Sequence, residues 1–321
     1  MATRSTDSDP LVSVVVPTYG RPETVLDALD SVATQTYDNI EVVVVDDHSP
    51  EPVEPRLREL SFDVQLRCLR HEENKGANAA RNTGLRAAAG EFVAFLDDDD
   101  VWTSEVVERE VRTFLEGGDS VGVVYTGSIM QNGDGEVIGT YTPEVSGDVL
   151  TDLFCGRRIA PFSNIMVRAS AIEDAGVLDE RFPSLQDREW YFRLAQHCEF
   201  EPVREPLVVH RTDDDARISD DFESKRDVSY PLLVEKHRSL AADHGDYYER
   251  RFIASLSKTV GAAGLRTGHY RDAVTLLGRA LRHYPLMPDA YVYLGLALGG
   301  RFVHRPVVFC KRKAKNLLSG V

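Results

Sequence analysis

Apolar residues form short runs and helical spacings that alternate along the N-terminal part of the chain. The β-branched run at 12–16, which ends at Pro17, is typical of a buried strand. Pro22 precedes apolar positions at helical spacing. The pattern predicts strands at 12–16, 40–45 and 91–96 and helices at 22–36 and 78–89. Strand, helix and strand in succession form a βαβ unit, which implies a parallel sheet buried on both faces.

The pattern becomes mixed after residue 120. It predicts strands at 121–125, 164–167 and 205–210, a helix at 187–197 and a hairpin turn at 132–135. With the N-terminal elements, this order predicts an α/β fold. The expected architecture is a doubly wound, mixed but mostly parallel sheet with helices on both faces.

From about residue 222 the chain has helical spacing throughout. Ala273, Ala280 and Pro285 have the spacing of the second helix of a tetratricopeptide unit, and Gly261 and Gly295 lie one repeat apart. Either a tetratricopeptide-like extension or a plain helical hairpin explains this spacing. The predicted domains are a disordered segment at 1–10, a sheet domain at 11–220, a helical extension at 221–300 and a basic, apolar tail at 301–321.

The chain is acidic, with 52 Asp and Glu against 37 Lys and Arg and a net charge of −15. High acid content with few Lys is typical of salt-adapted, halophilic proteomes, which is a hypothesis about the host. This charge argues against nucleic acid as a partner. The four Cys have no metal-binding spacing. The N-terminus is polar, so we expect no signal peptide. No uncharged apolar run reaches about 18 residues, so we expect no transmembrane helix and a cytoplasmic protein.

The tail at 301–321 has the opposite charge. It contains no acidic residue and six basic ones: Arg301, Arg305, Lys311, Arg312, Lys313 and Lys315. Apolar residues such as Phe302 and Val308 interleave with them. One interpretation is contact with an anionic membrane, which would hold the protein peripherally at the cytoplasmic face of the cell membrane. The other is a frayed, solubilising terminus.

Polar side chains follow three of the predicted strands. They are Pro17-Thr18-Tyr19, Asp46-Asp47 and Asp97-Asp98-Asp99-Asp100. In doubly wound sheets, ligands bind beyond the carboxyl ends of the strands, so three such clusters indicate a site. Adjacent carboxylates repel one another unless a cation or hydrogen-bond donors neutralise them. Mg²⁺ or Mn²⁺ beside substrate phosphates would suit these oxygen ligands, and a solvated acidic turn is the alternative.

These motifs continue with Ser31 to Tyr37, Glu41 to Ser49, Asn74 to Gly76, Ala79 to Gly84 and Phe95 to Trp102. In this order and spacing, they resemble the family 2 glycosyltransferases of GT-A fold, which use nucleotide-sugar donors. The resemblance covers about residues 11–215. It implies a GT-A sheet domain that binds a nucleotide sugar and Mg²⁺ or Mn²⁺.

The resemblance also implies the residues that bind the donor: Pro17, Tyr19, Asp46, Asp47, Lys75, Asn78, Arg81, Asp97 and Asp98. Pro17 and Tyr19 would border the uracil of a UDP-type donor, and Asp47 would accept a hydrogen bond from the base. Lys75 and Arg81 would supply positive charge near the donor, or they are surface charges. Asp46 would lie beside the base, or it closes a turn.

The acidic run matches the DxD element of the family. The resemblance implies that Asp98 lies near the ribose and that Asp99 binds the metal, which bridges the diphosphate. Asp97 could take either position, because four consecutive Asp leave the register open. A metal at this site acts as a Lewis acid that stabilises the departing nucleoside diphosphate.

The resemblance places the catalytic base at Asp187, before a helix. Gln186 replaces the usual Glu and removes one charge, which should lower rather than raise the pKa of Asp187. An Asp at a helix start also fits plain N-capping. His210 and Arg211 lie where related enzymes often place a diphosphate-contacting loop. They either clamp phosphate or are ordinary loop residues.

The sequence thus predicts an inverting, metal-dependent glycosyltransferase that moves a sugar from a nucleotide-diphospho donor, first of all a UDP-sugar, to an acceptor hydroxyl. A polyprenyl-phosphate-linked glycan for surface-protein glycosylation is the suggested acceptor. One alternative is a non-catalytic nucleotide-sugar-binding scaffold that presents the helical repeat. Another is a sugar-phosphate nucleotidyltransferase, although residues 17–21 supply no Gly-rich phosphate loop.

Overall fold

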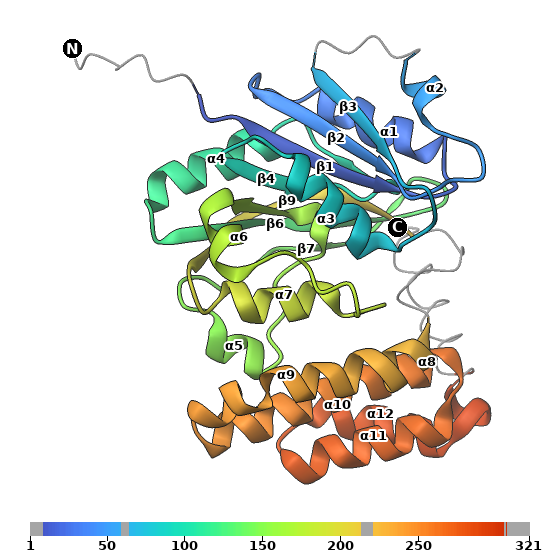
Figure 1. Cartoon of the computed structure of the whole chain (residues 1–321). Coiled ribbons are helices and arrows are strands. Elements are labelled where there is room, and N and C mark those ends of the chain that lie inside the picture. The colour runs from blue at the N-terminus through green and yellow to red at the C-terminus, as the bar shows by residue number, and fades with distance from the viewer. Residues whose placement is uncertain (1–8, 59–63, 213–220, 305, 307–321) are drawn as a thin grey trace. The chain divides into compact units, whose positions relative to one another are not determined.

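The computed structural model of the chain describes residues 9–58, 64–212, 221–304 and 306. The chain forms two compact units (Figure 1). The first comprises residues up to 150 with 158–181 and 186–215, and the second comprises 151–157, 182–185 and the chain from 216 onward. Most of the predicted disordered N-terminus and of the basic tail lies outside the described residues. The predicted domain boundaries at 10, 220 and 300 stay predictions.

A nine-stranded mixed sheet forms the first unit, in the order β3-β2-β1-β4-β8-β6-β9-β5, with β7 paired to β6. The strands are β1 (Val12–Thr18), β2 (Ile40–Asp46), β3 (Gln65–Arg70), β4 (Phe92–Phe95), β5 (Asp100–Trp102), β6 (Val121–Asn132), β7 (Val137–Tyr141), β8 (Ile165–Arg168) and β9 (Glu199–Thr212). The first four strands of this order are parallel neighbours, and β8 joins β4 to β6 in antiparallel pairs. The predicted mixed, doubly wound sheet is confirmed.

Helices cover both faces of this sheet. On one face, Val14 and Val42 belong to a buried cluster with residues of α1 (Thr24–Ala33) and α4 (Val106–Gly117). On the other face, Val43 packs with Ala80 of α3 (Ala77–Ala87). Because strand side chains alternate between faces, an uninterrupted apolar run is the pattern of a strand covered on both sides. The remaining helical segments of this unit and its borders are α2 (Glu54–Leu57), α5 (Leu150–Phe154), η1 (Phe162–Asn164), α6 (Ala169–Ala175) and α7 (Gln186–Leu194).

The predicted strands and helices of the sheet unit are all present, most with ends shifted by one to three residues, but β6 extends seven residues beyond the predicted end at 125 and β9 begins six residues before the predicted start at 205. The predicted hairpin turn joins β6 to β7, where Asn132 Oδ1 accepts hydrogen bonds from the backbone N–H groups of Asp134 and Glu136. Several elements were not predicted, among them β3, β5, β7, α2, α4, α5 and α6. β3 lies at the sheet edge and its side chains are exposed or half-buried, so its sequence lacks a strong apolar pattern.

Helices make up the second unit. They are α8 (Phe222–Ser224), η3 (Lys225–Ser229), α9 (Tyr230–Asp243), α10 (Asp246–Thr267), α11 (Tyr270–His283) and α12 (Pro288–Leu298). Ala273 and Leu277 of α11 are buried against Ala254 of α10 and Ala290 of α12. A Cβ on Gly261 would lie 2.9 Å from Leu277 Cγ, so α10 and α11 approach closely. The helical extension is confirmed, and its tetratricopeptide character stays a prediction.

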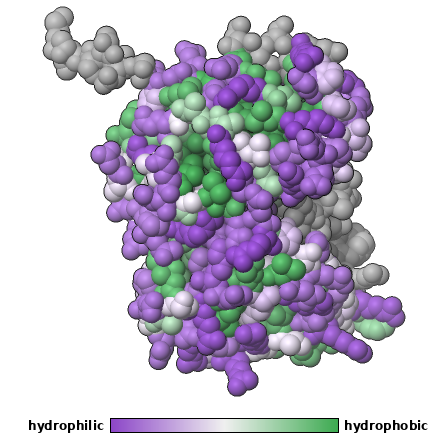
Figure 2. Space-filling view, viewed as in Figure 1, coloured by the Kyte–Doolittle hydropathy of each residue, from purple (hydrophilic) through white to green (hydrophobic). Residues whose placement is uncertain are grey.

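Hydrophilic residues predominate on the face of the molecule shown in Figure 2, and apolar residues gather in smaller patches on both units. Such a surface agrees with the acidic composition of the chain. None of the helices in the described ranges combines the length and the apolar character that crossing a bilayer requires.

Candidate functional site

The carboxyl ends of β1, β2 and β4 lie side by side at one edge of the sheet (Figure 1). Thr18 pairs in register with Asp46, and the backbone N–H of Asp47 donates to the Thr18 carbonyl at 2.9 Å. The acidic run begins two residues after β4 ends. The predicted convergence of the three polar clusters is therefore confirmed. Of the two residues expected at the base, Tyr19 is exposed, whereas Pro17 is buried within β1.

Asp46 caps the segment that follows β2. Its carboxylate accepts hydrogen bonds from the backbone N–H groups of Ser49 at 2.7 Å and Val53 at 3.3 Å, and from Arg70 Nη1. Burial alone would raise the pKa of Asp46, but the hydrogen bonds from Ser49, Arg70 and Val53 outweigh it and hold the pKa below its ordinary value. The turn-closing alternative thus accounts for Asp46. Its contact with the donor stays a prediction.

Asp47 organises the loop that leads into α3. Its Oδ1 accepts from the Lys75 N–H at 2.9 Å and from His71 Nδ1 at 2.7 Å, and its Oδ2 accepts from the Gly76 N–H at 2.7 Å. A carboxylate offers about four acceptor positions, so these three bonds leave one for a ligand. His48, the residue after Asp47, has a φ of 66°. This left-handed backbone conformation is uncommon for a non-glycine residue and is often found at functional sites.

Three members of the acidic run face the strand ends. Asp97 contacts Arg81 Nη2, and its backbone N–H donates to Ser163 Oγ at 3.0 Å. Asp98 accepts from Thr18 Oγ1 at 2.7 Å and from Arg21 Nη1 at 3.1 Å. Asp99 accepts from the same Arg21 nitrogen at 2.8 Å.

Burial dominates the electrostatics of Asp98 and raises the pKa of its carboxyl to about 6. The hydrogen bond from Thr18 and the charge of Arg21 oppose this rise, while Asp97 and Asp99 add to it. Asp98 thus sits in a site that favours neutralisation of negative charge.

Asp100, the fourth carboxylate, belongs to the framework. It starts β5 and accepts from Ser163 Oγ at 2.5 Å, and its Oδ1 lies 2.8 Å from His210 Nδ1. His210 Nε2 contacts Asn164 Oδ1 at 2.8 Å, while Asn164 Nδ2 donates to the Gly127 carbonyl. His210 lies in β9, so it is a strand residue that links three segments of the sheet unit, and not a loop residue. Arg211, beside it, donates to Asp27 of α1.

α3 carries two of the expected donor-binding residues on one buried face. Asn78 Nδ2 donates to the Asp179 carbonyl at 3.0 Å. The Arg81 guanidinium lies 4.2 Å from the centre of the Phe162 ring and contacts Asp97 through Nη2, and its Nε and Nη1 have no hydrogen-bond partner among the described residues. Arg81 is therefore a buried cation, not a surface charge. Lys75 is exposed and lies two residues before the same helix.

Asp187 is half-buried in the first turn of α7 and accepts from the backbone N–H of Arg188 at 2.7 Å. Burial raises the pKa of Asp187 above its ordinary value, against the hydrogen bond from Arg188 and the charges of Arg188, Arg158 and Arg81. The expectation that Gln186, in place of Glu, lowers the pKa of Asp187 stays a prediction, because the observed rise comes from burial and includes no comparison with Glu at position 186. A raised pKa suits a group that must accept a proton.

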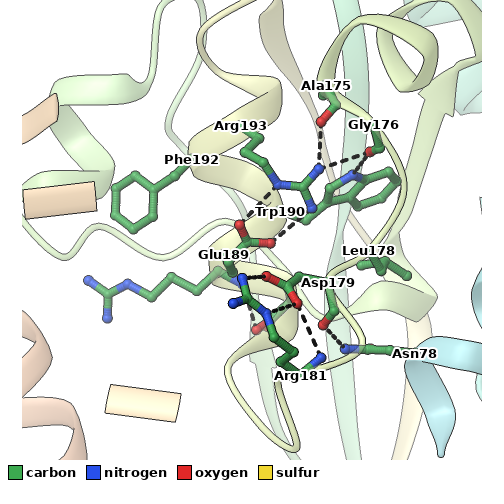
Figure 3. A network of polar contacts seen from close by, with 12 residues as sticks. Asn78, Ala175, Gly176, Leu178, Asp179, Arg181, Glu189, Trp190, Phe192 and Arg193 are labelled. Atoms are coloured by element: carbon green, nitrogen blue, oxygen red, sulfur yellow. Dashed lines mark hydrogen bonds and ion pairs between the residues drawn. The ribbon is translucent and has the colours of Figure 1, made fainter. Parts of the chain in front are cut away.

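A network of polar contacts fixes α7 (Figure 3). Glu189 is fully buried and binds Arg193 through both carboxylate oxygens at 2.9 Å. Arg193 Nη1 donates to the carbonyl of Gly176 at 3.0 Å, and Trp190 Nε1 donates to the same carbonyl at 2.9 Å. The expected role of this Glu–Arg pair as helix support is confirmed. These contacts anchor α7, the helix whose first turn contains Asp187.

Sequence reasoning missed several residues that shape this site: Arg21, His71, Arg158, Ser163 and Asn164. Arg21 lies two residues after the first polar cluster, so its position near the strand end could be predicted from the sequence. His71 and Ser163 come from segments without a strong pattern, and only the fold brings them beside the aspartates.

The oxygen ligands of the acidic run suit a divalent metal ion. No group of three or more His, Cys, Asp or Glu side chains within the described ranges is arranged to hold one. Mg²⁺ and Mn²⁺ commonly use only one or two carboxylates and complete their shell with water and substrate phosphates. Asp98 and Asp99 fit this requirement, because one nitrogen of Arg21 already lies within 3.1 Å of an oxygen of each.

Solved structures share this fold. Staphylococcus aureus TarS 1-349, solved in complex with UDP-GlcNAc, is 18% identical, covers 90% of this chain and 91% of its own, and has a TM-score of 0.56. A mannosyltransferase from Pyrobaculum calidifontis, PcManGT, in complex with GDP-Man and Mn²⁺, is 19% identical over 90% of this chain and 84% of its own, with a TM-score of 0.55. At these identities, the likeness concerns the fold alone.

Sequence comparison adds the family. The Escherichia coli protein WfgD, named as a UDP-Glc:alpha-D-GlcNAc-diphosphoundecaprenol beta-1,3-glucosyltransferase, is 40% identical over 108 residues, which are 34% of this chain and 42% of WfgD. The chain spans less than half the length of the first curated relatives it matches. The pattern of glycosyl transferase family 2 matches residues 13–174, which is half of the chain. The chain therefore belongs to glycosyl transferase family 2.

Proposed function

We propose that this protein is an inverting, metal-dependent glycosyltransferase that uses a nucleotide-diphospho-sugar donor, with UDP-sugars as the first candidates. The observation that carries the proposal is the position of Arg81. Its guanidinium contacts Asp97 in the acidic run, and its charge opposes the raised pKa of Asp187. The expected donor-binding carboxylates and the expected base therefore lie within electrostatic reach of one buried cation.

The donor site is supported by the groups that surround the strand ends. Tyr19 exposes half of its side chain and can stack on a base. Asp47 retains one acceptor position for a base N–H group, as counted from its three bonds. Lys75 is exposed beside it and can approach a diphosphate. TarS was solved in complex with UDP-GlcNAc, which favours a UDP-linked donor for this chain.

Asp187 is proposed as the general base. Its carboxylate would take the proton of an acceptor hydroxyl, whose oxygen then forms a bond to the anomeric carbon as the bond to the diphosphate oxygen breaks. One displacement of this kind inverts the configuration of the anomeric carbon. The polar contacts of Glu189, Trp190 and Arg193 anchor the helix that carries Asp187, and positioning of reacting groups contributes up to about 7–11 kcal/mol in favourable reactions.

Asp99, with Asp97 or Asp98, would hold Mg²⁺ or Mn²⁺, which stabilises the charge that develops on the departing diphosphate when it is bound. The complex of PcManGT with Mn²⁺ supports this part of the proposal. The name of WfgD, which includes a diphosphoundecaprenol, favours a lipid-linked glycan as the acceptor. A peripheral position at the cytoplasmic face of the membrane, with the tail at 301–321 on anionic lipid, would suit such an acceptor.

A screen of UDP- and GDP-sugars with Mn²⁺ tests the proposal, with release of nucleoside diphosphate as the measurement. We expect one donor to be turned over. With that donor, Asp187→Asn should lower kcat by about 100-fold or more, since general-base catalysis contributes roughly 10²–10⁴, and should leave donor affinity within about twofold, because Asn is nearly isosteric. Asp174→Asn is the matched control, since Asp174 is an exposed residue of α6.

Three outcomes contradict the proposal. Full activity of Asp187→Asn would remove the general base. Tight nucleotide-sugar binding without turnover would favour the scaffold alternative. Exchange of pyrophosphate into a nucleotide sugar would favour a nucleotidyltransferase.

A further inference from the structure

Arg21 joins two carboxylates of the acidic run through one atom. Its Nη1 lies 2.8 Å from Asp99 Oδ2 and 3.1 Å from Asp98 Oδ1. Asp98 also accepts from Thr18 Oγ1 at 2.7 Å, whereas among the described residues Asp99 has no further hydrogen bond or ion pair. The Arg21 nitrogen lies between two carboxylate oxygens, where the attraction for positive charge is strong. A bound metal cation would be attracted to the same position.

Two arginines of the described chain, Arg81 and Arg21, contact the acidic run, and their side chains differ in solvent exposure. The Arg81 side chain is 5% exposed and stacks on Phe162. The Arg21 side chain is 40% exposed and follows Gly20, which has a φ of 70°. An arginine that is partly in water and held mainly by ion pairs can leave at little cost, since such pairs are weak. Arg21 is therefore the cation that a ligand can displace.

Resting on the proposed function, we propose that Arg21 is a built-in counter-ion for the divalent metal: it occupies the carboxylates of Asp98 and Asp99 when no metal is bound, and the metal must displace it. The guanidinium neutralises the two carboxylates in the metal-free protein, so that adjacent aspartates do not repel one another. Since both cations need the same oxygens, Arg21 weakens the binding of metal alone.

Metal binding without nucleotide tests this inference in the full-length protein. The probe is Mn²⁺, titrated into wild type and Arg21→Met, with free Mn²⁺ followed by electron paramagnetic resonance. We expect Arg21→Met to bind Mn²⁺ about three- to tenfold more tightly, as the loss of two partly exposed ion pairs allows. Arg21→Lys, which keeps the charge, should stay within about twofold of wild type.

Arg56→Met is the matched control for the loss of one positive charge. Arg56 is exposed to a similar degree, at 43%, and its ion pair is with Glu23 and not with the acidic run. Its Mn²⁺ affinity should stay within about twofold of wild type, because exposed charges are screened over distances of about 10 Å. Equal tightening in Arg21→Met and Arg56→Met would show a general charge effect and overturn the inference.

The remaining outcomes separate the inference from the proposed function. If sugar transfer occurs but Arg21→Met binds Mn²⁺ as wild type does, only the inference fails. If Arg21→Met binds Mn²⁺ more tightly but no donor is turned over, only the proposed function fails. If neither the wild type nor Arg21→Met binds Mn²⁺, with or without UDP, the inference fails together with the metal dependence of the proposed function.

Discussion

Asp97, Asp98, Asp99 and Asp100 have the same side chain and four different surroundings. Asp97 is paired with a buried arginine, Asp98 is buried beside Thr18, and Asp99 is half-exposed. Asp100 is tied to Ser163 and His210 as part of the sheet. Asp100 is therefore a structural carboxylate of the sheet, while ligand binding by Asp97, Asp98 and Asp99 stays a prediction. Chain direction explains the position of Asp100, since β5 begins at Asp100 and turns its side chain into the unit.

Glu110 gives a prediction about a single residue outside the site. It lies on the buried face of α4, and neither of its carboxylate oxygens has a hydrogen-bond partner among the described residues. Burial raises its pKa well above the ordinary value. The pKa of Glu110 is thus higher in the folded protein than in the unfolded chain, where it is about 4.3. The contribution of Glu110 to stability is then complete below the unfolded pKa and is lost as the pH rises through the folded pKa. Glu110→Met should therefore stabilise the protein at neutral pH by about 1–3 kcal/mol.

Thermal unfolding between pH 5 and pH 8 checks this prediction. The stability gain of Glu110→Met should grow with pH, because only the wild type must keep a carboxyl neutral against rising pH. Glu116→Met in the same helix is the control, since Glu116 is exposed, and it should change stability by less than about 0.5 kcal/mol at every pH. An equal stability gain of Glu110→Met at pH 5 and pH 8 would refute the raised pKa of Glu110.

The sequence indicated the roles of single residues unevenly. Asp46, Asp47 and the acidic run stand directly after apolar strands, so their position at the sheet edge could be predicted. Arg81 could not be distinguished from a surface charge, because its burial depends on Phe162, a residue far along the chain. The same holds for His210, whose partners Asp100 and Asn164 meet it only through the pairing of β5 with β9.

At the scale of elements, the close contact of α3 with β1 positions Asn78 and Arg81. Gly84 permits it, because a Cβ there would lie 2.3 Å from Val15 Cγ1. Gly84→Ala should therefore destabilise the protein by about 1–3 kcal/mol, the usual cost of overpacking, and should reduce donor binding by moving α3. The midpoint of urea unfolding measures the first effect.

A second substitution distinguishes the contact from a general effect on the helix. In a Val15→Ala background the two clashing methyl groups are absent and only the 3.2 Å contact with the Cβ of residue 15 remains, so Gly84→Ala should then cost clearly less stability than it does with Val15 present. Gly278→Ala in α11 is the control for helix propensity, because nothing lies within 4 Å of its Cβ position, and it should stabilise by about 0.8–1.0 kcal/mol. Equal destabilisation by Gly84→Ala in both backgrounds would contradict the packing argument.

The predictability of elements follows their burial. β1, β2 and β4 are buried throughout, so their continuous apolar runs allowed these strands to be predicted from the sequence. β3 at the sheet edge is partly exposed, and β5 has three residues that begin with a carboxylate, so neither has the pattern of a strand. α4 buries Val107, Val111 and Phe114 at helical spacing, and the charged Glu110 on the same face interrupts this apolar pattern.

At the scale of the whole molecule, charge is distributed unequally along the chain. The net charge is −15, yet the tail at 301–321 contributes six positive charges and no negative one. The described start of this segment exposes Phe302 and Val303, at 78% and 43%. A basic segment with exposed apolar side chains on an acidic protein is the composition that binds anionic membranes, while the rest of the protein is repelled by them. Its halophilic origin stays a hypothesis.

Co-sedimentation with vesicles tests the tail. Lys311, Arg312, Lys313 and Lys315 are changed together to Gln in the full-length protein. Since a basic residue near such a surface contributes about 1 kcal/mol, binding to vesicles that contain phosphatidylglycerol should fall by more than about tenfold. Wild-type binding should also weaken at high salt, because the Debye length shortens to about 3 Å at 1 M.

A control with the same change in net charge decides between the tail and the overall charge. Arg86, Arg204, Arg271 and Arg282 are exposed residues of the described chain, and changing all four to Gln alters the net charge equally. If position matters, this control should keep most of the binding, because its charges lie outside the tail. Equal losses in both variants would show that net charge alone governs binding, and wild-type protein that stays in the supernatant would refute membrane contact by the tail.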